Sequence, residues 1–148
     1  MAGEVLFAYL HFLSVIALGA MLVAELLLLS AADALAARRL AWIDLGYLAA
    51  AIAALGSGVM RVGWYGKGAA FYLHNPVFWI KLALFVAIGL ISITPTRYFL
   101  RWRREAPEGG APAAETAYVR RFVAVEIVLA AFLPLAAVLM ARGIGSQP

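Results

Sequence analysis

Five ionisable side chains lie inside long apolar stretches of the sequence, and they are the residues best placed to do chemistry. They are His11, Glu25, Asp44, Lys81 and Glu126. A charged group is costly inside a bilayer, so such residues usually face the interior of a helix bundle and mark sites of binding or proton movement. Two of the five are basic and could bind a metal or an anion, whereas three are carboxylic acids that could carry protons.

His11 and Lys81 are expected at one depth of such a bundle. Each lies about five to seven residues inside its apolar stretch, which is roughly 7–10 Å below the outer boundary at the rise of a helix. Two basic groups do not neutralise each other, so another group is expected between them. A neutral imidazole can bind haem iron, and an amine can do so when it is deprotonated. The alternatives are a packing role for His11 and a Lys81 side chain that extends to the headgroups.

Glu25, Asp44 and Glu126 are expected together at a second level, in the cytoplasmic half. Glu25 comes two heptads after His11 and therefore lies on nearly the same helix face. One interpretation is a proton relay, because buried acids can pass protons. The other is structural, because buried carboxylates usually find a basic partner. The candidate partners are Arg38, Arg39, Arg97 and Arg120.

A segment rich in glycine and aromatic residues, 61–76, lies between the second and third apolar stretches. Its composition suits a cover over a flat anionic ligand, and it suits an anchor among lipid headgroups equally well. The segment contains Arg61 and His74. His74 is expected near the interface, which makes it a weaker ligand candidate than His11.

Membrane-spanning helices must position all these residues. The chain is 66% hydrophobic and 14% charged, with a mean hydropathy of +0.93, which lies outside the soluble range. A span needs about 20 apolar residues. The sequence predicts spans at about 5–30, 40–60, 77–100 and 122–140, with a flexible cytoplasmic connector at 105–117. The expected fold class is therefore all-α, a single-domain integral membrane four-helix bundle.

Basic residues are distributed unequally between the two sides of these spans. Eight arginines flank the first and third connections, whereas three basic residues lie on the other side. The positive-inside rule therefore places both termini in the periplasm, with the chain in a bacterial inner membrane. The net charge of +4 is explained by this pattern and does not imply nucleic acid. The absence of cysteine excludes iron–sulfur clusters and covalently attached c-type haem.

Three stretches of the sequence resemble a bacterial family of four-helix membrane proteins of unknown function. They are Leu10–Leu13, Gly68–Lys81 and Met140–Gly143. That family is similar, more remotely, to CopD-like copper-resistance domains and to HemJ-type protoporphyrinogen oxidases. In the HemJ type, a histidine of the first helix and a lysine of the third are implicated in holding b-type haem. The resemblance implies these roles for His11 and Lys81, as ligands of the haem iron.

The leading hypothesis is a membrane oxidoreductase that binds haem b or a related porphyrin, oxidises a porphyrinogen and passes electrons to the quinone pool. Arg61 and Arg142 would then bind the porphyrin propionates. A second hypothesis is a small transporter in which Glu25 or Glu126 carries protons in exchange for a solute. Copper handling is a third, although four Met and two His offer few soft ligands. A structural subunit of an assembly is a fourth, and the sequence is compatible with a homo-oligomer in the lipid bilayer.

Overall fold

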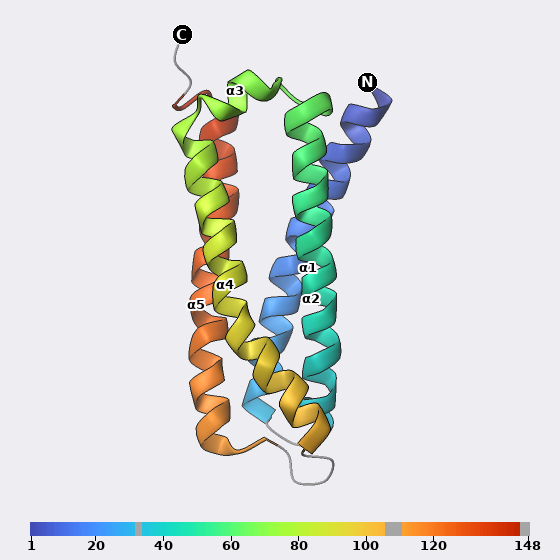
Figure 1. Cartoon of the computed structure of the whole chain (residues 1–148), viewed down its shortest axis with the longest axis vertical. Coiled ribbons are helices and arrows are strands. Elements are labelled where there is room, and N and C mark those ends of the chain that lie inside the picture. The colour runs from blue at the N-terminus through green and yellow to red at the C-terminus, as the bar shows by residue number, and fades with distance from the viewer. Residues whose placement is uncertain (32–33, 106–110, 146–148) are drawn as a thin grey trace.

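Four long helices dominate the computed structural model, which describes residues 1–31, 34–105 and 111–145 (Figure 1). Each of the four is long and apolar enough to cross a membrane. No strand occurs among the described residues, so the predicted all-α membrane bundle is confirmed. The elements are α1 (Ala2–Ala31), α2 (Ala34–Met60), a π-helical turn η1 (Arg61–Tyr65), α3 (Ala69–Leu73), α4 (Pro76–Glu105) and α5 (Ala113–Ala141).

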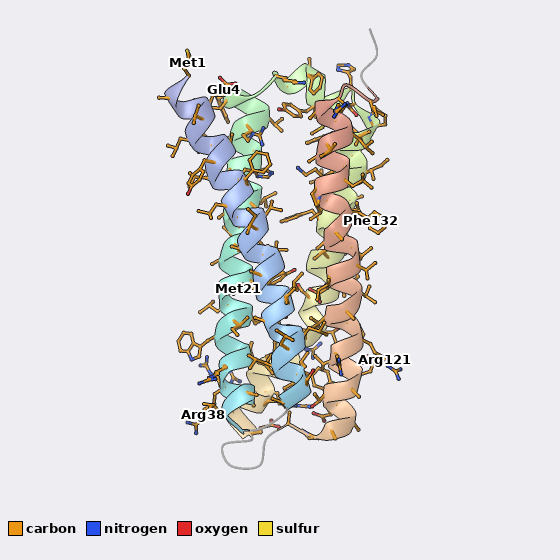
Figure 2. The ribbon with its side chains drawn as sticks, turned by 180° about the vertical axis from the view of Figure 1, so that it is seen from behind. Met1, Glu4, Met21, Arg38, Arg121 and Phe132 are labelled. Carbon is orange, nitrogen blue, oxygen red and sulfur yellow. The ribbon has the colours of Figure 1, made fainter. Side chains whose placement is uncertain are left out.

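The long helices form two antiparallel hairpins. α1 packs mainly along α2 and α4 mainly along α5, while contacts between α1 and α5 and between α2 and α4 join the hairpins. The start of α1 and the end of α5 lie at one end of the bundle together with α3, which we call the terminal end (Figure 1). Arg38 and Arg121 lie toward the opposite end, which we call the arginine end (Figure 2).

Asn75 fixes the start of α4. Its Oδ1 accepts a hydrogen bond of 2.9 Å from the backbone N–H of Val77, and Pro76 occupies the first helical position, where a missing N–H costs nothing. Its Nδ2 donates to the carbonyl oxygen of Ile144 at 3.2 Å. The Asn75-Pro76 pair therefore begins the helix as the sequence predicts, and it also ties α4 to the segment that follows α5.

Three helix boundaries differ from the sequence-based expectation. α2 begins at Ala34 rather than near residue 40, and α4 ends at Glu105 rather than near residue 100. α5 begins at Ala113, so residues 113–117, which were expected in the connector, are helical. The rest of that connector, 106–110, lies outside the described residues. Hydropathy marks only the part of a helix that lies in hydrocarbon, whereas alanine, arginine and glutamate continue a helix beyond it.

The apolar core has two parts along the bundle axis. The arginine-end cluster is formed by Leu29, Ala37, Leu40, Ala41, Phe99, Trp102, Val119 and Val123. The middle cluster is formed by Leu18, Leu22, Tyr47, Ala50, Ile88 and Leu133. In α4 the first fully buried residue is Ile88, and before it only partly buried side chains such as Leu84 and Phe85 pack against the middle cluster. The two hairpins are also farther apart toward the terminal end (Figure 1).

Candidate functional sites in the membrane interior

The three carboxylic acids gather in one layer, which we call the acidic layer. Glu25 on α1, Asp44 on α2 and Glu126 on α5 are all buried. The carboxyl groups of Asp44 and Glu126 lie close enough to Glu25 for their charges to act on it. On α1, Glu25 stands between Leu22 of the middle cluster and Leu29 of the arginine-end cluster. The acidic layer therefore lies between the two apolar clusters.

Two hydroxyl groups that the sequence analysis missed complete the layer. Thr96 on α4 donates a hydrogen bond of 2.8 Å to Oδ1 of Asp44. The hydroxyl of Tyr47 is near enough to the carboxyl group of Glu126 to interact with it. Tyr47 lies one helical turn after Asp44, and this spacing could have revealed it, whereas no local pattern marks Thr96. Each of the four long helices thus contributes a polar side chain to this level.

No arginine pairs with these acids in the described part of the chain. The ion pairs found there join Arg101 to Glu105 and to Glu115. Glu25 is 2% exposed and Glu126 1% exposed, and Oε1 of each is buried without a hydrogen-bond partner. An ionised carboxylate buried without a counter-charge is strongly disfavoured. The structural interpretation therefore lacks the arginine that it requires.

His11 is held in one orientation against α2. Its Nδ1 lies 3.0 Å from the carbonyl oxygen of Ala54 and 3.1 Å from the hydroxyl oxygen of Ser57. Because a carbonyl oxygen only accepts, Nδ1 donates, and a neutral ring then keeps its free lone pair on Nε2. The close approach depends on Gly58, where a Cβ would lie 3.3 Å from Cε1 of the ring. Among the described residues, Nε2 makes no hydrogen bond.

Lys81 and Arg61 bring two more positive charges close to His11. The charges of both act on the imidazole, and that of Arg61 also acts on Lys81. The Arg61 guanidinium lies over the ring of Phe12, with Cζ 5.8 Å from the ring centroid. Lys81 is half-buried, and no carboxylate pairs with it in the ranges that the structure describes. We call His11, Lys81 and Arg61 the basic site.

His74 and Arg142 are not brought into the basic site. His74 is exposed, and its Nδ1 donates to the carbonyl oxygen of Ala70 at 2.8 Å. Arg142 is exposed and caps the end of α5. Within the described residues, no three His, Cys, Asp or Glu side chains are grouped so that they could hold a metal ion. The candidate chemistry is therefore concentrated in the basic site and the acidic layer.

Comparison with known proteins places the whole chain in one family. No curated protein and no solved structure matches it. The comparisons give no similarity to CopD-like domains or to HemJ-type oxidases, so that part of the resemblance rests on His11 and Lys81 alone. The model of a family described as predicted membrane protein (DUF2214) matches residues 3–145. Because this match covers nearly the full length, the chain belongs to the DUF2214 family of membrane proteins.

Proposed function

We propose that the protein binds haem b or a related porphyrin at the basic site and takes part in a membrane redox reaction. The observation that carries the proposal is the orientation of His11. An axial histidine usually donates its second ring nitrogen to a backbone carbonyl or another acceptor, which fixes the tautomer and the ring plane. The bond from Nδ1 to Ala54 supplies that arrangement, and Nε2 is left as the ligand atom.

The charges around His11 suit an anionic ligand. Lys81 and Arg61 repel each other and lie near the neutral imidazole of His11, and no carboxylate of the described chain pairs with Lys81. Porphyrin propionates would relieve this repulsion, because a guanidinium binds a carboxylate as a charged fork. Arg61 is therefore assigned to a propionate. Lys81 would help to hold the porphyrin from α4, following the resemblance to HemJ-type proteins.

Bound haem would supply one-electron transfer, and the reaction expected from the resemblance is oxidation of a porphyrinogen with the quinone pool as acceptor. The residues of this chain would bind and orient the group. Ser57 and Ala54 hold the imidazole of His11, and Gly58 lets the ring lie against α2. The middle cluster lies between this site and the arginine end of the bundle, and it would exclude water from that side.

The absorption spectrum of the purified protein, with and without added haemin, tests this proposal. We expect a Soret band in the parent protein. His11→Ala should lose most of the pigment, because an imidazole is the stronger axial ligand, whereas Lys81→Ala should retain pigment with a shifted band and potential. His74→Ala is the matched control, since it removes the other histidine of the chain and should leave the spectrum unchanged. A colourless protein that binds no haemin, or an unchanged spectrum in the double variant at His11 and Lys81, would refute the proposal.

Proton-coupled solute transport is the second candidate function. The observation that favours it is the acidic layer, in which Glu25 and Glu126 lack the arginine partners of a structural pair. Solute-driven acidification measured in vesicles would separate transport from redox chemistry, because haem binding alone moves no protons with a solute. Copper handling has no comparable observation in its favour.

A further inference from the structure

We propose that the acidic layer is an exchangeable proton-binding site, in which Glu25 and Glu126 are neutral acids whose protons are passed on through Tyr47 and Asp44. The inference does not depend on haem binding, and it deepens the second candidate function by naming the groups that bind and pass the proton. It rests on burial, on unpaired oxygen atoms and on the set of groups that surround the layer.

The first step of the argument concerns the two glutamate side chains. Each is more than nine-tenths buried, and each has one oxygen atom, Oε1, without a hydrogen-bond partner. A buried polar atom without a partner is rare in folded proteins and requires an explanation. A bound proton supplies one, because it removes the negative charge whose burial without a counter-charge would be far more costly than that of a neutral acid.

The second step concerns every group that faces the layer. α1 contributes Glu25, α5 contributes Glu126, and α2 contributes both Asp44 and Tyr47. α4 contributes only hydroxyl groups, those of Thr96 toward Asp44 and Ser92 toward Tyr47. Among the described residues, no lysine, arginine or histidine side chain is found in contact with the acidic layer. Within the described ranges of the chain, no group of positive charge therefore faces the layer.

The third step distinguishes a proton from a metal ion. A structural or catalytic metal site needs several ligand side chains directed at one point. The described acids are not grouped in that way, since no three of them could hold a metal ion together. A proton needs only one oxygen atom to bind, and each glutamate supplies one.

The fourth step concerns transfer between the acids. Tyr47 interacts with the carboxyl group of Glu126 and lies within electrostatic range of the carboxyl group of Glu25. Asp44 acts on both glutamates and accepts a hydrogen bond from Thr96. In each transfer one O–H bond breaks and another forms, and no oxidant or reductant is needed. A hydroxyl can donate one proton while it accepts another, so Tyr47 is suited to relay.

Infrared spectroscopy of the full-length protein in lipid nanodiscs tests the inference. A protonated carboxylic acid has a carbonyl stretch that a carboxylate lacks, and this stretch shifts when D replaces H. We expect the stretch in the parent protein at neutral pH, with a shift after transfer to D₂O. Glu25→Gln and Glu126→Gln should each remove part of the band, and the double variant should remove most of it. Glu4→Gln is the matched control, because Glu4 lies on the same helix but is exposed.

The Tyr47→Phe variant distinguishes a relay from a static site. It keeps all three acids and the apolar ring, so we expect the band to remain and its exchange with D₂O to slow severalfold. Absence of the carboxylic acid band from the parent protein would overturn the inference, and so would a band that survives in the double variant. A band that never exchanges would also overturn it, since the protons would then be structural. Haem-free protein serves for all these measurements, so failure here is distinct from failure of haem binding.

Discussion

Asn75 allows a quantitative test of how the terminal end is held together. Its side chain is fully buried, caps α4 through the N–H of Val77 and donates to the carbonyl oxygen of Ile144. A Cβ on Gly145 would lie 2.7 Å from Oδ1, so the carboxamide packs directly on the backbone after α5. Asn75→Ala removes a helix cap worth about 1 kcal/mol and a second hydrogen bond worth about as much. The expected loss is about 2 kcal/mol, or a factor of about thirty in the unfolding equilibrium constant.

Unfolding in mixed micelles by increasing SDS, followed by tryptophan fluorescence, measures this loss. Asn75→Ser is the matched variant, because serine is also a preferred N-cap whose hydroxyl can accept from Val77, but its shorter side chain cannot replace the donor to Ile144. Its expected loss is therefore about half, roughly 1 kcal/mol. Equal stability of the parent and the alanine variant would refute the reasoning, and so would a serine variant as unstable as the alanine variant.

Two further predictions concern the terminal end and the orientation in the membrane. In Gly66→Ala the new Cβ would collide with the carbonyl oxygen of Arg61 and with the Tyr72 hydroxyl. We therefore expect the free energy of unfolding to fall by about 1–3 kcal/mol in the same SDS assay. An unchanged unfolding midpoint would contradict the predicted collision. The unequal distribution of arginine predicts that a reporter fused after the C-terminus is periplasmic and that one inserted between α4 and α5 is cytoplasmic. A cytoplasmic signal from the C-terminal fusion would contradict the predicted topology.

The four spans and the start of α4 could be predicted because the signals are local. Hydropathy marks each span, and Asn75-Pro76 carries its own capping chemistry. The gathering of the acids at one level could also be predicted, because the rise of a helix converts residue number into depth. The orientation of His11 could not be predicted, because it depends on a hydrogen bond to the carbonyl oxygen of Ala54, 43 residues later in the chain.

The described ion pairs do not include the acid–arginine pairs that the structural interpretation needs, and that interpretation considered depth without helix face. On α2 the buried face that contains Asp44 continues to Ala41 and Ala37, whereas Arg38 is exposed. On α5 the face of Glu126 continues to Val123 and Val119, and Arg120 is exposed. Residues share a face at separations of three, four or seven, so the helical period already places these arginines elsewhere.

The division of the acidic layer between two hairpins has a consequence for biogenesis. The first hairpin carries Glu25 and Asp44, whereas Glu126 lies on α5, later in the chain. The first two acids are therefore synthesised before Glu126. Insertion of an acidic residue such as aspartate at the centre of a span costs about 2.5–3.5 kcal/mol. Each leucine lowers the insertion free energy by about 0.3–0.6 kcal/mol. The run Leu26–Leu29 directly after Glu25 thus favours insertion of α1 before Glu126 has been synthesised.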